Sequence, residues 1–359
     1  AATASTYSVT GENLPDCRQS GCTYELTYLQ STTVMEQLLE FATNWYQLTL
    51  LLGVIMLIYG GNLLVEGGVA LAKHFGISTL VIGLTVVAFS TSSPELALNI
   101  VASINGNGDL SIGNIFGSNI ANLGLVLGIG AFICKLPVSG RIVRTEFPLL
   151  VGTTLLVGLV ASFGSLNRNW GVLFLLLFAV IMWLWFRLGR KESKLVKEAE
   201  DVTPEGDITK AKAWCALIGG LFILGIGGKA TEIGAVETAT TLGLSKLIIG
   251  STVVAIATSL PEVVTTVIAA RKNHPDLAVG NVVGSNIFNI IFVLPVTMLV
   301  HPLQAPDEVW VYASVMFMMT LLAWYFTTDK RIKRHEGIIL VALYVCFLVG
   351  VTLWSFSKS

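Results

Sequence analysis

Two acidic residues of this sequence stand inside apolar runs, where a charge is costly. Glu95 directly follows Pro94 in the run GLTVVAFSTSSPELALNIV, and Glu262 directly follows Pro261 in GSTVVAIATSLPEVVTTVI. A carboxylate at the centre of a membrane-spanning helix costs about 2.5–3.5 kcal/mol on insertion scales. Each acid could be kept protonated or hydrogen-bonded for helix packing, or the two could bind cations. Their occurrence at equivalent positions favours cation binding.

The two acids belong to a stretch that the chain contains twice. Residues 83–122 align without a gap on residues 250–289, at an offset of 167, with 19 of 40 positions identical. Each copy places hydroxyl residues before the Pro-Glu pair and a G-S-N-x-x-N segment after it. The oxygen-bearing residues shared by the two copies are Thr91 and Thr258, Ser92 and Ser259, Ser118 and Ser285, and Asn122 and Asn289.

The prolines add backbone oxygens to this set. Pro94 has no N–H for the carbonyl of Ser90, so we expect the helix to open between Ala88 and Pro94, and likewise between Ala255 and Pro261. In a bilayer the freed carbonyls must be buried by neighbouring helices or must line a cavity, where an ion can replace a hydrogen-bond donor.

Carboxylates, hydroxyls, amides and carbonyls, without Cys or His, form an all-oxygen site suited to Ca²⁺ or Na⁺ and unsuited to zinc or copper. One Ca²⁺ or two Na⁺ would neutralise two carboxylates, which is a basis for exchange. For the four polar residues of the G-S-N-x-x-N segments, hydrogen bonds between helices are an alternative role. These residues are Ser118, Asn122, Ser285 and Asn289.

Apolar helices must position these groups. The chain has 359 residues, of which 53% are hydrophobic and 13% charged, and its mean hydropathy is +0.74. This composition predicts an all-α polytopic membrane protein, and the net charge of −1 gives no sign of nucleic-acid binding. We expect ten transmembrane helices, at about residues 45–64, 78–103, 110–133, 146–163, 170–187, 213–233, 246–270, 277–300, 309–327 and 337–356.

The offset of 167 divides the ten expected spans into two five-helix repeats, residues 44–187 and 213–359, which follow an N-terminal tail, 1–43, and flank a charged linker, 188–212. An odd number of spans per repeat inverts the second copy in the membrane. Of the 22 Lys and Arg residues, 17 fall in alternate connections, which the positive-inside rule assigns to the cytoplasm. Both termini are then extracytoplasmic, in the plasma (cell inner) membrane, where Cys17 and Cys22 could form a disulfide.

The paired GxTVVAxxTSxPE and GNxxGSNxxN motifs resemble the two alpha repeats of the cation/calcium exchanger superfamily, closest to the prokaryotic sodium/calcium exchangers. The resemblance covers the ten expected spans. It implies ten helices in two inverted-topology repeats, four ion sites in a central cluster, and exchange of three Na⁺ for one Ca²⁺. It also implies that the first and sixth spans slide to alternate access, with gating glycine pairs at Gly60-Gly61 and Gly227-Gly228.

Residue by residue, the resemblance implies that Glu95 and Glu262 are the main Ca²⁺ ligands, together with the carbonyls of Thr91 and Thr258. Sodium would use the same acids and eight further residues: Ala88, Ser92, Ser118, Asn122, Ala255, Ser259, Ser285 and Asn289. The chain departs from the family in having Ser90 and Ala257 where Gly usually precedes Thr-Ser. Several members, potassium-dependent ones included, have Asp at the position of Asn289, which argues against potassium dependence and leaves the sodium stoichiometry open.

Three other functions compete with sodium/calcium exchange. A proton/calcium antiporter of the same superfamily would carry a Gly-Asn-x-x-Glu pattern, which the TSxPE segments lack. A cation channel would need no counter-ion. An intramembrane aspartyl protease is suggested by GxGD at Gly106–Asp109, but no partner Asp stands in an apolar run. We therefore expect a transporter rather than an enzyme, with no catalytic residues and no cofactor. Its partners are the two ions and the lipid bilayer, and a monomer is compatible with the sequence.

Overall fold

The computed structural model describes residue 39 and residues 41–199, 208–243, 253, 255–306 and 308–358. The chain divides into two compact units, Ala1–Trp45 and Tyr46–Ser359, of which the second carries the fold. The proposed Cys17–Cys22 pair lies outside the described residues.

The second unit is helical throughout, apart from four two-residue strands. Its helices before the linker are α2 (Tyr46–Phe75), α3 (Thr79–Ile82), η1 (Gly83–Val87), α4 (Ala88–Thr91), α5 (Ser93–Ile104), α6 (Gly108–Ala121), η2 (Asn122–Val126), α7 (Leu127–Ile133), η3 (Ile142–Glu146), α8 (Phe147–Ala161) and α9 (Arg168–Ala199). Those after it are α10 (Lys210–Thr241), α12 (Ala255–Thr258), α13 (Leu260–Arg271), α14 (Pro275–Phe288), η5 (Asn289–Val293), α15 (Leu294–Val300), α16 (Val309–Thr327) and α17 (Arg334–Lys358). The η elements are π-helical turns inside longer helices.

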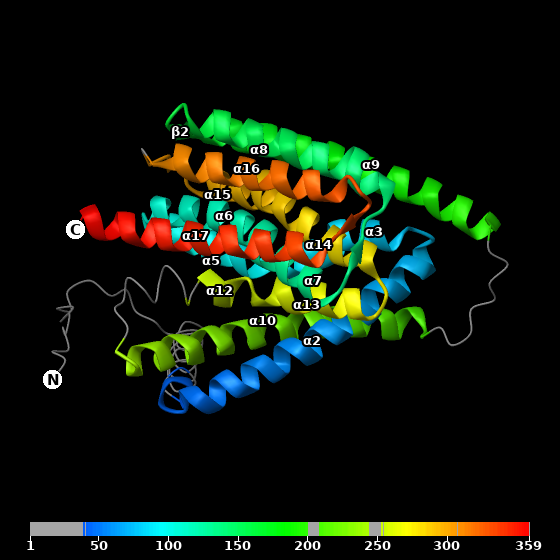
Figure 1. The fold of residues 1–359 in the computed structure, drawn as a ribbon, viewed down its shortest axis with the longest axis horizontal. Helices are drawn as coiled ribbons and strands as arrows, with labels where there is room; N and C mark the ends of the chain where they lie inside the picture. Colours follow the sequence, from blue (N-terminus) through cyan, green and yellow to red (C-terminus); the bar gives the residue numbers. More distant parts are fainter. Residues whose placement is uncertain are drawn as a thin grey trace, which may run out of the picture. The chain divides into compact units, whose positions relative to one another are not determined.

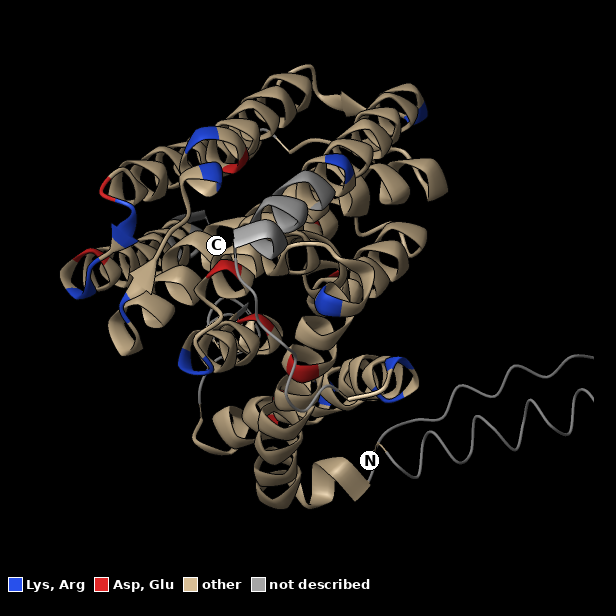
Figure 2. Ribbon diagram, turned by 90° about the vertical axis from the view of Figure 1, so that its right-hand side faces the viewer, with Lys and Arg blue, Asp and Glu red and all other residues tan. Residues whose placement is uncertain are grey.

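By length and apolarity, eight helical runs in the described part of the chain could cross a membrane, and nine if the bent pair Thr79–Thr91 and Ser93–Ile104 is one span. The remaining expected span, 246–270, begins in residues that the structure does not describe, so the ten-helix arrangement stays a prediction. The chain is thus an all-helical multi-pass membrane protein. Figure 2 shows its few charged residues as isolated spots on an otherwise uncharged bundle.

Three helices are longer than the sequence predicted. Helices α2 and α10 have 30 and 32 residues and end shortly before glycines with positive φ, Gly76 (60°) and Gly243 (78°). Their apolar runs stop earlier, but both helices continue through charged residues and through Gly67 and Gly234, where their backbones pack against each other. Helix α9 likewise continues to Ala199, which makes the first part of the predicted linker helical.

Helices α2 and α10 pack along each other over most of their length (Figure 1). The contact follows two rows of glycines spaced seven residues apart. At each of them an added Cβ would come within 2.5–2.8 Å of the facing helix. Because seven residues are close to two helical turns, each row stays on one face and the two backbones touch throughout. The six glycines are Gly53, Gly60 and Gly67 in α2, and Gly220, Gly227 and Gly234 in α10.

Two small antiparallel sheets join the halves of the chain. Strand β1 (Leu136–Pro137) pairs with β4 (Arg331–Ile332), and β2 (Ser165–Leu166) pairs with β3 (Leu303–Gln304). Strand β3 follows β1 by 167 residues, and β4 follows β2 by 166. Each sheet therefore joins the loop after one repeat's third expected span to the loop after the other repeat's fourth.

The core of the bundle is formed by the runs α6–η2–α7 and α14–η5–α15, which are buried over most of their length. These two runs carry the G-S-N-x-x-N segments. Helix α14 contacts η1, α3 and α4 of the first repeat as well as its own neighbour α13. The second copy of the motif thus lies directly against the first copy's broken helix.

Candidate functional site

Both helices that carry a Pro-Glu pair break where the sequence predicted an opening. Helix α4 ends at Thr91, Ser92 leaves helical geometry with φ −86° and ψ 3°, and α5 starts at Ser93 in a direction bent by 44°. In the second copy Ser259 has φ −89° and ψ 0° between α12 and α13. Each break lies one or two residues before its proline, as expected from a ring that cannot continue the preceding helix.

Side-chain hydroxyls take up several carbonyls around the first break. Ser93 Oγ donates to the carbonyl of Phe89 at 2.7 Å, and Ser90 Oγ donates to that of Val86 at 2.7 Å. The carbonyl of Ala88 accepts from the N–H of Ser92 at 3.0 Å and from Thr91 Oγ1 at 3.3 Å. The Ala88 oxygen is thus engaged by the N–H of Ser92, whereas the single hydrogen of the Thr91 hydroxyl is shared between this carbonyl and Asn281 Oδ1.

The two acids are buried at the broken helices. Glu95 is 3% exposed and Glu262 is 1% exposed. Thr91 joins the two copies directly: its Oγ1 donates to Asn281 Oδ1 at 3.2 Å and lies 3.2 Å from Ser285 Oγ. The predicted meeting of the two copies therefore occurs. The alternative role of Ser285, a hydrogen bond between helices, is also realised.

Several oxygens at this meeting point make no hydrogen bond within the described residues. They are Glu95 Oε2, Glu262 Oε2, Ser92 Oγ and Asn289 Oδ1, and all are buried. An unpaired buried polar atom costs about 1–3 kcal/mol and an unpaired buried charge costs more. Because these atoms can all accept from or coordinate a cation and come from both copies, the cluster fits a hard cation such as Na⁺ or Ca²⁺.

Two cavities lie beside the broken helices, and one of them reaches Glu95. One, of about 440 Å³, is lined by Pro94, Glu95 and Thr258 and opens between α5 and α10. The other, of about 430 Å³, reaches Ser118 and Thr258 between α5, α6, α16 and α17. Both include Leu98 and Thr258 in their walls. Glu95 can therefore be approached through the first cavity, whose wall shares Leu98 and Thr258 with the second.

The two copies of the motif have different surroundings. An added Cβ at Gly113 or Gly117 would meet nothing within 4 Å. At the equivalent Gly280 and Gly284 it would come within 3.0 Å and 2.6 Å of the carbonyls of Leu80 and Leu84. The glycine strip of α6 thus borders a cavity, whereas that of α14 is closed by α3 and η1.

Sequence reasoning missed a polar network behind Glu95. Asn99, which is fully buried, donates through Nδ2 to the carbonyl of Glu95 at 2.7 Å and to Asn114 Oδ1 at 2.8 Å. Its Oδ1 accepts from Ser111 Oγ at 2.9 Å. The repeat counterpart of Asn99 is Thr266, which accepts from Asn281 Nδ2 at 3.2 Å. Because Asn and Thr differ at this position, comparing the two copies gave no signal for it.

The structure also shows π-helical turns that the sequence did not predict. Turn η2 begins at Asn122 and η5 begins at Asn289, again 167 residues apart. Such turns are rare, and they often occur at functional sites because they displace side chains and carbonyls from their regular directions. Here each begins at a predicted ligand.

The two glycine pairs divide their roles. Gly60 and Gly227 lie in the contact between α2 and α10. Gly61 faces Ile268 of α13, with 2.9 Å from an added Cβ to Cδ1, and Gly228 faces Pro261, with 3.3 Å to Cγ. One glycine of each pair therefore joins α2 to α10, and the other lets the pair lie against α13.

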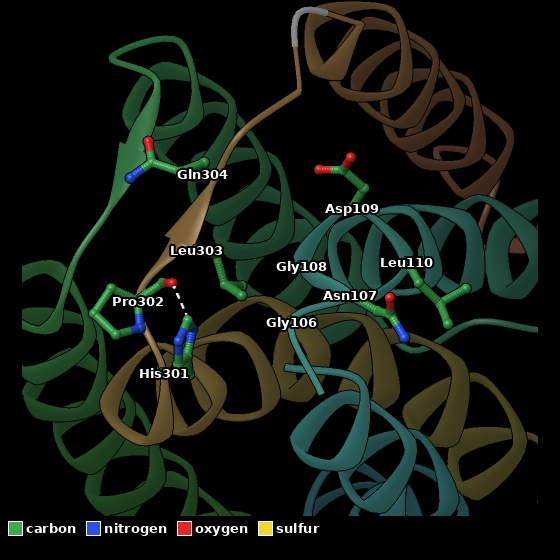
Figure 3. A pocket seen from close by; sticks show the side chains of 9 residues that line it. All are labelled: Gly106, Asn107, Gly108, Asp109, Leu110, His301, Pro302, Leu303 and Gln304. Carbon is green, nitrogen blue, oxygen red and sulfur yellow. Dashed lines mark hydrogen bonds between the residues drawn. The ribbon is translucent and has the colours of Figure 1, made fainter. Parts of the chain in front are cut away.

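A third cavity, of about 510 Å³, contains the GxGD sequence (Figure 3). It lies between Gly106–Leu110 and His301–Gln304, where His301 Nδ1 is 3.0 Å from the carbonyl of Pro302. Among the described residues that line it, Asp109 is the only acid. A catalytic aspartate pair is thus absent from this cavity, and Asp109 lies in the first turn of α6, as expected of a charge that favours a helix N-terminus.

Most of the predicted site residues are buried at the broken helices and at the two G-S-N-x-x-N segments. The buried ones are Ala88, Thr91, Ser92, Glu95, Ser118, Asn122, Ser259, Glu262, Ser285 and Asn289. Thr258 is partly buried at the junction of the two cavities. The side chain of Ala255 lies outside the described residues.

Broken helices that meet inside a bundle, with buried acids and a cavity that reaches one of them, are typical of membrane transporters of cations. The sequence comparison specifies which kind. The model of the family "Sodium/calcium exchanger protein" matches residues 45–187 and 212–353. The chain belongs to this sodium/calcium exchanger family, and it is an antiporter of that class.

Individual relatives agree with this assignment. The sodium/calcium exchanger MaX1 of Methanosarcina acetivorans is 33% identical over 341 residues, which cover 84% of this chain and 97% of the relative. The inner membrane protein YrbG of Escherichia coli is 32% identical over 312 residues, or 83% and 94% of the two chains. Among solved structures, the sodium-calcium exchanger NCX_Mj soaked with Na⁺ and Ca²⁺ matches with a TM-score of 0.73 and 32% identity, over 85% of this chain and 97% of that one.

Proposed function

We propose that the chain exchanges three Na⁺ for one Ca²⁺ across the plasma membrane by alternating access, and that this exchange moves net charge. The proposed ligands are Glu95 and Glu262 with the carbonyls of Thr91 and Thr258 for Ca²⁺. For Na⁺ they are the two acids with Ala88, Ala255, Ser92, Ser259, Ser118, Ser285, Asn122 and Asn289.

The observation that carries this proposal is the set of buried acceptors from both copies. Glu95 Oε2 and Glu262 Oε2 make no hydrogen bond in the described part of the chain, and Asn289 Oδ1 and Ser92 Oγ share this property. A buried carboxylate needs a proton or a cation to offset its desolvation. A bound cation could be coordinated by carboxylate, hydroxyl and amide oxygens alike, so it would offset the burial of these acceptors as well as the charge of the acids.

Charge accounting supports the electrogenic form. Neither Asn122 nor Asn289 adds a charge to the carboxylates of Glu95 and Glu262. One Ca²⁺ therefore gives a neutral occupied site, while three Na⁺ give one excess positive charge. Membrane voltage should then act mainly on the conformational change of the sodium-loaded protein between its outward-open and inward-open states, at about 2.3 kcal/mol per charge for each 100 mV.

The asymmetry of the two copies supports an alternating-access mechanism. We propose ten spans in two inverted repeats with both termini outside, as the sequence predicted. The cavities at Glu95 and Ser118 then open to the outside. In the opposite state the two copies would exchange surroundings, so that the α14 strip opens and the α6 strip closes.

The test is uptake of radioactive Ca²⁺ into proteoliposomes under one imposed gradient at a time. An outward sodium gradient should drive Ca²⁺ above equilibrium. Because three Na⁺ leave for each Ca²⁺ that enters, an inside-positive potential should speed this uptake and an inside-negative potential should slow it. Potassium and pH gradients should drive none. Uptake driven by a pH gradient would instead identify a proton/calcium antiporter, and voltage-insensitive uptake would indicate two-for-one exchange.

A further inference from the structure

Two charged residues stand in the wall of the cavity that leads to Glu95. Lys229 and Glu232 of α10 line the 440 Å³ cavity together with Pro94, Glu95 and Thr258. Lys229 lies 19 residues, or about 28 Å, from the start of α10 at Lys210. The hydrocarbon core of a bilayer is about 30 Å thick, so Lys229 lies toward the outer end of this candidate span, at the mouth of the cavity.

The two side chains form an ion pair. Lys229 Nζ lies 2.9 Å from Glu232 Oε1, on the same face of the helix at a spacing of three residues. The lysine side chain is 62% exposed and the glutamate side chain 26% exposed. The two charged groups are therefore partly exposed in the cavity wall and are not part of the buried core.

The pair occurs in one copy only. At an offset of 167, Lys229 corresponds to Asn62 and Glu232 to Val65, so the first repeat carries neither charge on α2. Asn62 donates to the carbonyl of Ile58 and Val65 is fully buried. The helix packing that the repeats share is thus achieved without these charges, which leaves the cavity as the place where they matter.

A fixed ammonium beside a cation path is unfavourable unless it is neutralised. In a narrow cavity with low-dielectric walls, one charge changes the local concentration of mobile ions, by a factor that depends on the ion's valence. Lys229 alone would repel Na⁺ and Ca²⁺ from Glu95, and Glu232 alone would attract both. Paired, they leave the potential at the cavity near zero.

We propose that Lys229 and Glu232 set the electrostatic potential of the outer access cavity. Lys229 repels incoming cations and Glu232 attracts them, and the balance between the two charges sets the apparent affinities for external Ca²⁺ and Na⁺. This inference rests on the proposed exchange function, because it assigns the cavity as the route of the exchanged ions. Glu232 is the carboxylate that an incoming cation meets before Glu95. The ammonium group of Lys229 competes with the incoming cation for the carboxylate of Glu232.

The proposal makes a valence-dependent prediction. A potential that multiplies the local Na⁺ concentration by some factor multiplies that of a divalent ion by the square of the factor. For partly exposed charges of this kind we expect about a twofold change for Na⁺ and therefore about a fourfold change for Ca²⁺. A short-range ligand, by contrast, would show no such square relation.

The experiment uses right-side-out membrane vesicles from cells expressing the full chain, loaded with sodium, with external Ca²⁺ varied. Lys229→Met should lower the half-saturating Ca²⁺ concentration about fourfold, and Glu232→Gln should raise it about fourfold. The double variant should return to the wild-type value, and Lys229→Arg, which keeps the charge, should match it as well. In sodium-driven Ca²⁺ efflux, the half-saturating external Na⁺ concentration should shift about twofold in the same directions.

Maximal rates and ionic strength separate an electrostatic role from a structural one. The maximal exchange rate should stay within about twofold of wild type in all four variants, and the shifts should shrink when ionic strength is raised with choline chloride. Single variants that shift the half-saturating concentration in the same direction, or that lower only the maximal rate, would overturn the inference. Equal factors for Na⁺ and Ca²⁺ would do so too. Absence of sodium-driven uptake in wild-type vesicles would instead contradict the proposed function.

Discussion

The hairpins α5–α6 and α13–α14 carry the same motif in two different environments. On α5, Leu98 is 39% exposed and lines both access cavities, whereas its counterpart on α13, Thr265, is fully buried. Helix α13 is covered by α2 at Gly61 and by α10 at Gly228. The difference teaches that access depends on which hairpin the α2–α10 pair covers, and not on the motif itself.

The hairpins also differ in how they are held together. Three hydrogen bonds from Asn99 tie α5 to α6 and to its own first turn. In the other hairpin Asn281 Nδ2 donates to Thr266 Oγ1, and Asn281 in turn accepts from Thr91 of the first repeat. The open hairpin is thus braced internally, while the closed one is braced against its partner repeat.

The largest expected effect tests whether both hairpins serve one site. Glu95→Gln and Glu262→Gln should each reduce sodium-driven Ca²⁺ uptake by about 100-fold or more, because the one remaining carboxylate cannot neutralise a buried Ca²⁺. The matched control is Glu237→Gln, which makes the same chemical change at an acid of α10 that lines neither cavity. This variant should transport normally. Normal uptake in either acid variant would refute the shared site.

The next prediction concerns the two glycine strips. Gly284→Ala places a methyl group 2.6 Å from the carbonyl of Leu84, so it should lower stability by about 1–3 kcal/mol and slow exchange. Gly117→Ala points into open space and should leave the melting temperature in detergent close to that of wild type. Equal melting temperatures for the two variants would show that the strips do not differ as described.

The bracing of the hairpins predicts a smaller difference. Asn99→Ala removes three hydrogen bonds and should cost about 2–3 kcal/mol, whereas Thr266→Ala removes one and should cost about 1 kcal/mol. Both can be measured as thermal or denaturant stability of the purified protein. Asn99 also bonds the carbonyl of Glu95, so Asn99→Ala should raise the half-saturating Ca²⁺ concentration more than Thr266→Ala does. A larger loss of stability in Thr266→Ala than in Asn99→Ala would contradict the internal bracing.

The smallest effect concerns the connections at the hairpin tips. Burial, together with repulsion from Lys73 and Lys272, lowers the pKa of His274 below its usual 6.5. An unfolded chain then binds this proton more readily, so the stability of the folded protein falls as pH drops from about 6.5 toward the lowered pKa. His274→Asn, which installs the residue found at the equivalent Asn107, should lose less stability over this range. If stability depended on pH in the same way in His274→Asn and in wild type, this role of His274 would be contradicted.

Much of the fold could be predicted because the apolar runs have sharp ends. The expected span 309–327 coincides with α16, whose run stops at the polar sequence Thr327–Lys330. The predicted ends of α2 and α10 are too early because the contact between the two helices, through Gly67 and Gly234, continues beyond their apolar runs. The break at Ser92 was predictable from Pro94, since proline excludes a regular helix just before it.

The site could be predicted only in part. Duplication pointed to Glu95 and Glu262 because both copies carry them, but it could not reveal Asn99, whose counterpart is Thr266. The π-helical turns at Asn122 and Asn289 were not predicted either, because the sequence indicates the helical period but not where a turn widens. Likewise, identical motifs in α6 and α14 do not indicate which is open, because that is a property of one conformational state.

The most direct test of the account is equilibrium binding of radioactive Ca²⁺ to the purified protein, with sodium as competitor. The account predicts one Ca²⁺ per chain, displaced by Na⁺ with a Hill coefficient above one, and loss of that binding in both Glu95→Gln and Glu262→Gln. Two independent Ca²⁺ sites, each surviving removal of the other repeat's acid, would contradict it.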